Sequence, residues 1–420
     1  MLSESDVIII GAGAAGLSAA KELGQLGLTY TLVEASHRIG GRVYSEEIAP
    51  GVWFDLGCAW LVGGASNPFV AIADELGIPL GKDKSNLYKE KNHRFQRNGA
   101  PLNKDQRAAC LRFYNDSYKA ISATAKQGQD VAISDVIDLD NEFAIPFLCN
   151  VTVTEGKDID LVSTADFASA TGELGFQVLH GFGNLVAAWG ADVVVSLNTC
   201  VERVDWSGHR VTVETSKGVI AGRTALITVS TGILACGNIL FNPGLPDWKT
   251  EAIHGLPMGT ENKIGVYFDA DVFGVDGRGY YSTWNDDGNA AKVDVSAMGL
   301  NTAIVFVGGR HGVWLEKRDQ QTCHNFAVDR IADIFGNDIR KHVKRSIATA
   351  WSTDPWTRGS WACALPGQAY QRANLQHPVD ERLFFAGEAT VYGGQGTCHG
   401  AYQSGIRAAK QIASKLNVKP

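Results

Sequence analysis

The first 34 residues constrain the fold more than any other feature of this chain. An apolar run at residues 7–10 predicts a buried strand, and Gly11, Gly13 and Gly16 follow it in G-x-G-x-x-G spacing. The first glycine permits a tight turn, the second lets backbone approach a pyrophosphate, and the third lets a helix pack on the strand. We therefore expect a helix over residues 14–26, with its positive amino end at the phosphates.

A second strand is expected at residues 29–33, and it ends at Glu34. A carboxylate at this point accepts hydrogen bonds from the adenosine ribose and repels a 2′-phosphate. Strand, glycines, helix, strand and acid together predict a Rossmann-type dinucleotide site. Its contacts are expected to include Ala15 and Ala35.

Two further glycine-rich segments point to the same ligand. Adjacent glycines between Arg38 and Arg42 imply backbone against a flat or charged group, and guanidinium groups suit a diphosphate. Near the carboxyl end, a buried strand within residues 383–390 runs to Gly-Glu, and a glycine-rich run leads into a helix over residues 406–416. The candidate cofactor contacts here are Arg38, Gly40, Gly41, Arg42, Gly387, Glu388, Gly396, Thr397, Cys398 and Ala401.

The chain resembles the flavin-containing amine oxidase family, which includes monoamine, polyamine and spermine oxidases, flavin histone demethylases and L-amino-acid oxidases. The motifs are R-x-G-G-R at residues 38–42, D-L-G-x-x-W at 55–60, G-T-x-x-K-I at 259–264 and W-x-x-D-P at 351–355. Residues 397–401 keep the T-x-H-G-A pattern of the polyamine oxidase and spermine oxidase branch. The motifs follow the family's order over nearly the whole chain.

The resemblance implies an α/β fold in which a Rossmann-type FAD-binding domain is interleaved with an α+β substrate domain. The FAD-binding domain is expected from residues 1–75, 181–244 and 351–420. The substrate-binding domain is expected from residues 76–180 and 245–350.

The resemblance also implies an FAD-dependent amine oxidoreductase. Hydride passes from the carbon next to the amine nitrogen to flavin N5, and the resulting imine hydrolyses to an aldehyde or ketone. O2, giving H2O2, or another acceptor then takes the electrons. Lys263 matches the family lysine that holds a water against flavin N5. Further implied cofactor contacts are Leu56, Gly57, Trp60, Val201, Val204 and Trp351.

Several positions depart from the family pattern. Val62 replaces the histidine of the W-I-H-G motif, and Trp361 stands in the segment that carries the covalent cysteine of monoamine oxidases. We therefore expect FAD to be bound non-covalently. The two facing tyrosines of monoamine oxidases are matched by Ala362 and Thr397, so an aromatic cage would be rebuilt from Trp361 and Tyr392. The expected substrate pocket contains Val62, Trp361, Tyr392 and Thr397.

The remaining segments show ordinary periodicity. A helix over residues 105–124 would turn Ala109, Phe113 and Tyr118 inward. Another helix is expected at residues 321–335. Strands are expected at residues 192–197, 200–206, 210–216, 225–229, 262–269 and 302–308.

Composition excludes several classes of function. The net charge of −7 gives no sign of a nucleic-acid or anionic-membrane partner. The eight cysteines lack C-x-x-C pairing, which favours reduced thiols over a metal site or a disulfide framework. No apolar run reaches the roughly 20 residues that cross a bilayer. With the fingerprint starting at residue 7, we expect a soluble, cytoplasmic protein acting on a small amine. The oligomeric state stays open, a homodimer included.

Three other functions stay open. An L-amino-acid oxidase would need an arginine facing the flavin, and the candidates are Arg94, Arg97, Arg112 and Arg310. A desaturase or porphyrinogen oxidase would not need Lys263, and a non-catalytic flavoprotein scaffold would turn nothing over. The substrate is not readable, because its pocket falls in residues 80–180 and 270–320.

Overall fold

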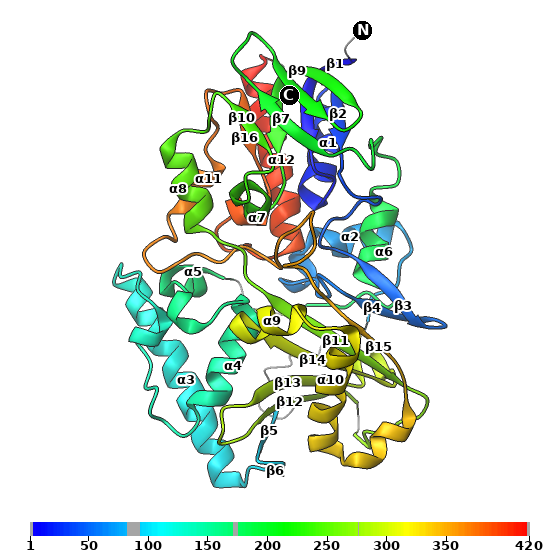
Figure 1. Cartoon of the computed structure of the whole chain (residues 1–420), viewed down its shortest axis with the longest axis vertical. Helices are drawn as coiled ribbons and strands as arrows, with labels where there is room; N and C mark the ends of the chain where they lie inside the picture. The colour runs from blue at the N-terminus through cyan, green and yellow to red at the C-terminus, as the bar shows by residue number, and fades with distance from the viewer. Residues whose placement is uncertain (1–2, 82–92, 171–174, 276, 418–420) are drawn as a thin grey trace.

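Two β-sheets divide the molecule along its longest axis (Figure 1). The computed structural model describes residues 3–81, 93–170, 175–275 and 277–417. Both chain ends lie at the end of the molecule that carries the first sheet (Figure 1). The chain crosses between the sheets several times, so each sheet is assembled from distant segments.

The first sheet has the order β10-β7-β8-β9-β1-β2, and β16 also pairs with β9. Its strands are β1 (Ser3–Ile10), β2 (Tyr30–Val33), β7 (Val201–Asp205), β8 (Val211–Thr215), β9 (Gly218–Ile227), β10 (Leu240–Asn242) and β16 (Leu383–Phe385). Strand β1 is parallel to both β2 and β9. Val7, Ile8 and Ile9 of β1 are fully buried, as a parallel strand covered on both faces requires.

Two helices from opposite ends of the chain pack together beside this sheet. They are α1 (Ala14–Gln25) and α12 (Cys398–Lys415). A Cβ added to Gly405 would lie 2.1 Å from the carbonyl oxygen of Ala15 and 2.2 Å from Oγ of Ser18. The hydroxyl of Ser18 donates to the carbonyl of Tyr402 at 2.8 Å. Only glycine lets the helices approach this closely, so the two chain ends are held as one body.

The second sheet has the order β15-β11-β14-β13-β12-β5-β6. Its strands are β5 (His93–Arg97), β6 (Ala100–Pro101), β11 (Glu261–Phe268), β12 (Gly279–Trp284), β13 (Ala290–Val295), β14 (Thr302–Gly308) and β15 (Val343–Ala348). One buried face packs Val266, Val293 and Val305 against α10 (Gln320–Phe335). The opposite face is more polar and turns towards the first sheet's side of the molecule.

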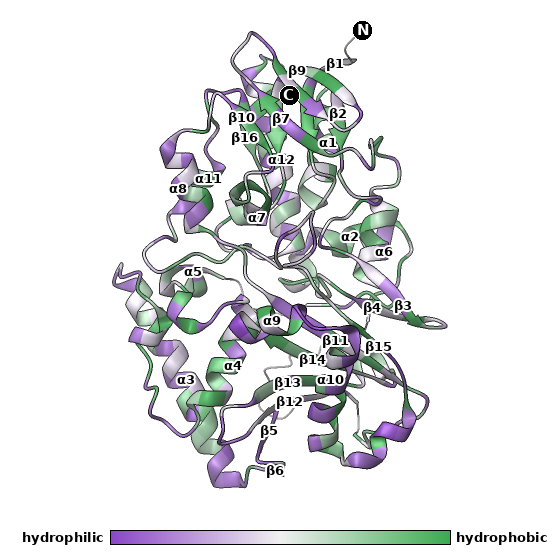
Figure 2. Ribbon diagram, in the orientation of Figure 1, coloured by the Kyte–Doolittle hydropathy of each residue, from purple (hydrophilic) through white to green (hydrophobic). Residues whose placement is uncertain are grey.

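The other helices and the short hairpin complete the two halves. They are β3 (Ser45–Ala49), β4 (Val52–Asp55), α2 (Pro68–Glu75), α3 (Lys104–Lys126), α4 (Ala144–Glu155), α5 (Thr164–Ser169), α6 (Phe182–Trp189), α7 (Thr231–Ala235), α8 (Asp247–Gly255), α9 (Gly309–Glu316) and α11 (Gln371–Gln376). Hydrophobic colour concentrates on the strands, and the outer helices carry hydrophilic residues (Figure 2). Among the described helices, none combines the length and apolar character needed to cross a membrane.

Two expectations about elements were wrong. Residues 192–197 form no strand, because the segment touches β2 only through a bridge between Ser196 and Val33, and Val194 is 80% exposed. Helix α12 begins at Cys398 and not at residue 406, because the Thr397 side chain accepts from the Gly400 N–H and caps it there.

In α3 the residues expected to turn inward do pack against the core, but others on the helix are buried more deeply. The residues that it buries are Cys110, Tyr114, Ser117 and Ile121. Ala109, Phe113 and Tyr118 are half-buried at the edges of this stripe.

Candidate active site

A cavity of about 710 Å³ is lined by residues from both sheets. Its size is typical of cofactor and substrate sites. The Rossmann segment and the start of α12 line one part, and polar residues of β11, β12 and β13 line another. One cavity therefore joins segments from the two halves of the molecule.

The three fingerprint glycines occupy the positions that their roles require. Gly11 has φ +104, and an added Cβ would lie 2.7 Å from Oγ1 of Thr228. A Cβ at Gly16 would lie 1.9 Å from the Gly11 carbonyl oxygen, so α1 can pack here only with glycine. Gly13 differs, because nothing lies within 4 Å of an added Cβ. Gly13 borders the cavity and leaves backbone open to a ligand, which fits the pyrophosphate of a dinucleotide.

Glu34 is fixed at the end of β2 by backbone donors. The Ala12 N–H donates to its Oε2 at 2.7 Å, and the Ser36 N–H donates to its Oε1 at 2.8 Å. The carboxylate lines the cavity and keeps further lone pairs for ribose hydroxyls.

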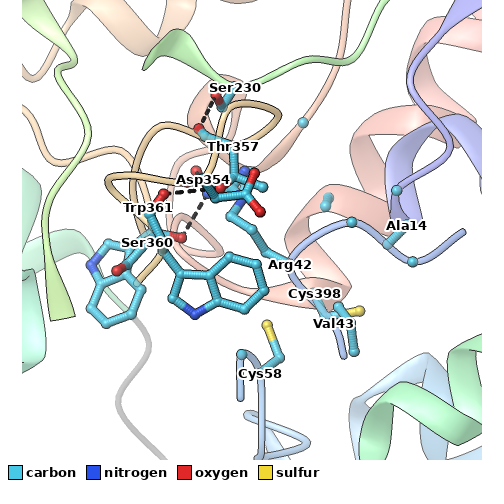
Figure 3. Close-up of a pocket in the computed structure, with 18 of the residues that line it drawn as sticks. Ala14, Arg42, Val43, Cys58, Ser230, Asp354, Thr357, Ser360, Trp361 and Cys398 are labelled. Carbon is cyan, nitrogen blue, oxygen red and sulfur yellow. Dashed lines mark hydrogen bonds and ion pairs between the residues drawn. The ribbon is translucent and has the colours of Figure 1, made fainter. Parts of the chain in front are cut away.

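Arg42 joins three motifs that lie far apart in the sequence. Its Nη1 donates to the Ser360 carbonyl at 2.8 Å and to Oε1 of Glu388 at 2.9 Å. Figure 3 shows Arg42 reaching the Ser360 backbone beside Trp361. Glu388 also accepts from the N–H groups of Ala362 and Gly396, each at 3.0 Å. Its carboxylate is thus engaged within the protein, and it orders the loops around the cavity.

The amino end of α12 faces the cavity through Cys398 and Ala401. A Cβ added to Gly400 would lie 2.0 Å from the Gly394 carbonyl oxygen, so the glycine-rich loop lies directly on the helix start. The first N–H groups and the helix dipole stabilise negative charge at this end. Burial raises the pKa of the Cys398 thiol well above its ordinary value, which favours an inert side chain.

Lys263 reaches from β11 to the D-L-G loop. Its Nζ donates to the Gly57 carbonyl and, at 3.4 Å, to the Asp55 carbonyl. Its backbone N–H donates to Oγ1 of Thr349 at 2.9 Å. The side chain is buried and lines the cavity. Burial also raises the pKa of the Asp55 carboxyl, which accepts from the Phe182 N–H at 2.8 Å.

The floor of the cavity is the polar face of the second sheet. Lys263 pairs with Phe306 of β14, and Phe306 pairs with Lys292 of β13. Since paired residues share a face, these side chains stand in a row across the sheet. Lys292 Nζ donates to Oδ1 of Asn150 at 2.5 Å and lies 5.1 Å from the Tyr280 ring. Burial lowers the pKa of Lys292 to about 8.

Two buried ion pairs stand beside this floor. Asp294 pairs with Arg278, whose guanidinium lies 4.4 Å from the Trp60 ring centroid. Asp166 holds Arg372 through contacts of 2.6 Å, with both side chains 1% exposed. Each pair compensates its own charge and rigidifies the wall behind it.

Most residues proposed from the sequence line this one cavity. Those that do are Gly11, Gly13, Ala15, Glu34, Ala35, Arg38, Gly40, Gly41, Arg42, Gly57, Trp60, Val62, Val201, Lys263, Trp351, Trp361, Gly387, Glu388, Gly396, Thr397, Cys398 and Ala401.

Four proposed residues do not line it. Gly16 lies within α1 and packs against the Gly11 carbonyl, and Val204 is fully buried in the first sheet's core. The Leu56 carbonyl accepts from Nε1 of Trp351 at 3.1 Å, so this residue supports the loop from behind. Tyr392 is 50% exposed and takes no part in the lining, so the expected cage does not include it.

Sequence reasoning missed the polar floor and the carboxylates near it. The missed residues are Glu155, Glu261, Tyr280, Lys292, Asp294 and Phe306. Only Glu261 carried a signal, since it lies two positions before Lys263 and therefore on the same face of a strand. The others depend on the register between strands.

The arginines that an L-amino-acid oxidase would use are engaged elsewhere. Arg94 donates to the Tyr281 hydroxyl at 2.5 Å, Arg97 to Asp286 at 2.7 Å and Arg310 to Asp160 at 2.7 Å. Arg112 is exposed on α3. Within the described residues, the arginines lining the cavity are Arg38 and Arg42, which belong to the dinucleotide segment.

Comparisons with known proteins agree with this geometry. Polyamine oxidase 5 of Oryza sativa subsp. japonica is 29% identical, and the alignment covers 99% of this chain and 89% of that protein. Lysine-specific histone demethylase 2 of Homo sapiens is 27% identical over 97% of this chain and 53% of that protein. The structure of cyclohexylamine oxidase from Brevibacterium oxydans IH-35A matches with a TM-score of 0.82, 22% identity and coverage of 98% and 99%. This last match confirms the expected fold.

The model of the flavin containing amine oxidoreductase family matches residues 14–413. That span runs from the first residue of α1 into the last turns of α12, and it includes the lining residues from Ala14 to Ala401. This chain is a member of the flavin-containing amine oxidoreductase family, an enzyme whose cofactor is FAD.

Proposed function

We propose that the protein oxidises a small aliphatic amine at the carbon next to nitrogen. The imine formed is hydrolysed to an aldehyde or ketone, and O2 takes the electrons to give H2O2. The observation that carries this proposal is the single cavity, which joins the dinucleotide fingerprint at Gly13 to the buried ammonium of Lys263. Residues 1–75, 181–244 and 351–420 would hold the cofactor, and residues 76–180 and 245–350 the substrate. Residues 82–92 and 171–174 of the latter lie outside the described residues.

FAD, when bound, supplies the acceptor for the hydride. Around it, Glu34 binds ribose hydroxyls, Arg38 and the glycines beside it face the diphosphate, and the start of α12 stabilises negative charge. Lys263 positions a water molecule for attack on the imine carbon. FAD is held non-covalently, because Trp361 stands where a covalent cysteine would be needed.

The substrate class is supported by the relatives and by the charges of the cavity. Relatives are named for polyamines, and one structural match is named for cyclohexylamine. Val62, in place of a family histidine, makes the site beside Trp60 more apolar. Arginines that would bind a carboxylate are engaged elsewhere, which favours amines over amino acids.

Anaerobic mixing with a panel of amines tests this proposal. The holoenzyme is combined with cyclohexylamine, benzylamine, putrescine and spermidine, and in parallel with L-leucine and L-phenylalanine. At least one amine is expected to bleach the flavin absorbance, and air is expected to restore it with release of peroxide. Bleaching by the amino acids alone would establish the other function, and no bleaching by any compound would exclude both.

We further propose that the protein works in a reducing compartment such as the cytoplasm. All eight cysteines are free thiols, which is typical of cytosolic proteins.

A further inference from the structure

Two carboxylates in the cavity differ from the others in lacking a basic or N–H partner. The carboxylates that line it are Glu34, Glu155, Glu261, Asp294, Asp354 and Glu388. Four of them have such a partner. Glu34 accepts from a backbone N–H group, and Asp294 and Glu388 each pair with an arginine. Asp354 accepts from the Trp356 N–H at 2.7 Å.

Glu155 and Glu261 are the exceptions. In the part of the chain that the structure describes, the hydrogen-bond partner of the Glu155 carboxyl group is the Cys363 thiol alone, at 3.9 Å. Among the described residues, no N–H, O–H or ion-pair partner reaches the Glu261 carboxylate. Both carboxyl groups therefore border the cavity without a basic partner in the described ranges.

The backbone of Glu261 is held in place close to Lys263, the residue proposed to position the reacting water. It opens β11 two positions before Lys263, so the two side chains share a face about 7 Å apart. Its N–H donates to Ser360 Oγ at 2.9 Å, and the same hydroxyl donates back to its carbonyl at 3.0 Å. Across the sheet it pairs with Gly308, which has no side chain to cover the carboxylate.

The charges around Glu261 favour its ionised form, although burial raises its pKa. Lys263 on the same strand and Lys292 on β13 both act against that rise. The end of α4 brings Glu155, where burial and the negative charge of Asp166 raise the pKa to about 8. At neutral pH Glu155 is thus largely protonated, whereas the two lysines near Glu261 favour its carboxylate form.

Other charged groups on the elements packed against β11 are engaged elsewhere. On α9, Arg310 pairs with Asp160, and Glu316 accepts from the Ser352 N–H at 3.0 Å. On β15, Lys344 pairs with an aspartate at the far end of β11, and Arg345 donates to backbone carbonyls of β3. Strand β14 contributes no charged residue.

We propose that Glu261 is a catalytic residue that binds the ammonium form of the reacting amine and accepts one of its protons. An N–H bond of the ammonium breaks, its electron pair stays on nitrogen, and the proton moves to a carboxylate oxygen. The neutral amine that remains can lose hydride, and Glu261 returns its proton to solvent after the product leaves. This role rests on the proposed amine oxidation.

Compensation of the substrate's positive charge is the physical reason for this role. An ammonium that enters an enclosed space beside two lysines is disfavoured unless a carboxylate compensates it. Transfer of a proton within that pair leaves two neutral groups, which a cavity of low dielectric constant tolerates better than two ions.

The test compares Glu261→Gln with Asp192→Asn, which removes an exposed carboxylate outside the cavity lining, in the holoenzyme. The rate of anaerobic flavin reduction is measured from pH 6 to 10 with the fastest amine of the panel. For E261Q we expect a rate at least tenfold below wild type at pH 7. The deficit should shrink towards the pKa of the free amine, because neutral amine needs no proton acceptor. D192N should keep the wild-type profile, and Glu261→Asp should recover part of the rate.

A constant deficit of E261Q at every pH would assign it a structural role and overturn the proposal. So would a wild-type profile for E261Q, or the E261Q profile appearing in D192N. Should E261Q fail to bind FAD, the E261D profile decides in the same way.

A second readout separates this inference from the proposed function. Tetramethylammonium is a cation that can neither be oxidised in this way nor lose a proton, and its binding is followed by thermal shift of the holoenzyme. We expect its apparent Kd to rise at least fivefold in E261Q and to stay unchanged in D192N. An unchanged Kd in E261Q would contradict cation binding by Glu261, whether or not wild type oxidises amines.

Discussion

Single residues explain why this cavity suits amine oxidation. Lys263 is the clearest case, because its ammonium is buried between the polar sheet and the D-L-G loop, where a bound water would be oriented. The motif G-T-x-x-K-I identified it, whereas composition alone would have left it an ordinary strand lysine. Its backbone is fixed by Thr349 and its Nζ by carbonyl oxygens of the loop.

Replacing Lys263 by methionine tests that role. K263M keeps the length of the side chain and removes the donor, so FAD content should stay near wild type. We expect amine turnover to fall by about 100-fold, the usual effect of removing one positioned donor. Turnover is measured as peroxide release together with anaerobic flavin reduction. Turnover within twofold of wild type would show that Lys263 positions nothing essential.

The buried pair between Asp166 and Arg372 should matter for stability. Arg372 also donates to the carbonyls of Ala362 at 2.9 Å and Ala389 at 3.1 Å. Asp166→Asn leaves the guanidinium uncompensated, and we expect a loss of about 3–5 kcal/mol in the free energy of unfolding. Asp192→Asn, at an exposed pair with Lys21, is the control and should cost less than about 1 kcal/mol. Equal effects in denaturant titrations would contradict this assignment.

Glu155 should make the stability of the apoprotein depend on pH. Its folded pKa is about 8 against an ordinary value of 4.5, so the folded state holds this proton more tightly than the unfolded chain does. The resulting stabilisation is present below pH 4.5 and is lost as pH rises through 8. Glu155→Gln should therefore flatten the fall in unfolding free energy between pH 5 and 8.5. An unchanged slope would contradict the raised pKa.

The residues that line the cavity were predictable where a local motif fixes their position. The glycines, Glu34 and Lys263 each belong to a short pattern with a chemical reason. Glu155 and Lys292 belong to no pattern, because they meet the cavity only through the packing of α4 and the register of β13. Tyr392 is the opposite case. It lies next to a motif, yet its side chain is half exposed and does not line the cavity.

At the scale of elements, the contact between α1 and α12 is decisive. Gly405→Ala would force a methyl group against the Ala15 carbonyl. Relieving this clash requires a backbone shift, which costs free energy. We expect a loss of about 1–3 kcal/mol and a reduced FAD content.

Gly24→Ala on α1 is the matched control, because nothing lies within 4 Å of an added Cβ. It should raise stability by about 0.5–1 kcal/mol. Thermal unfolding and the flavin-to-protein absorbance ratio measure both variants. A G405A protein as stable as G24A would show that the helices need no close approach.

Elements were predictable where periodicity and end signals agree. The span of β14 matched the sequence prediction in full, and α1 and α10 matched to within a residue at each end. Residues 192–197 looked like a strand because valines recur there, but only one bridge to β2 forms. The start of α12 was hidden by glycines, which lower helix propensity and are kept because Gly400 and Gly405 allow backbone contacts.

At the scale of the whole molecule, chain segments alternate between the two sheets, and the cavity lies where they meet. Sequence motifs predict well which residues on the first sheet's side line the cavity, since dinucleotide contacts come from loops next to strand ends. The lining residues of the second sheet are harder to predict, since the polar floor depends on strand pairing that no single segment of the sequence determines. The oligomeric state, a homodimer included, stays open to measurement in solution.

The central claim is that glycines near the start of the chain and the helix at its end hold one FAD together. Titration of the apoprotein with FAD, followed by flavin absorbance and fluorescence, tests this most directly. Gly13→Leu and Ala401→Leu each place a larger side chain at the cavity lining, and circular dichroism confirms that they fold. We expect one FAD per wild-type chain and at least tenfold weaker binding in both variants. Wild type that stays colourless with excess FAD, or a variant folded and unimpaired at either end, would contradict the claim.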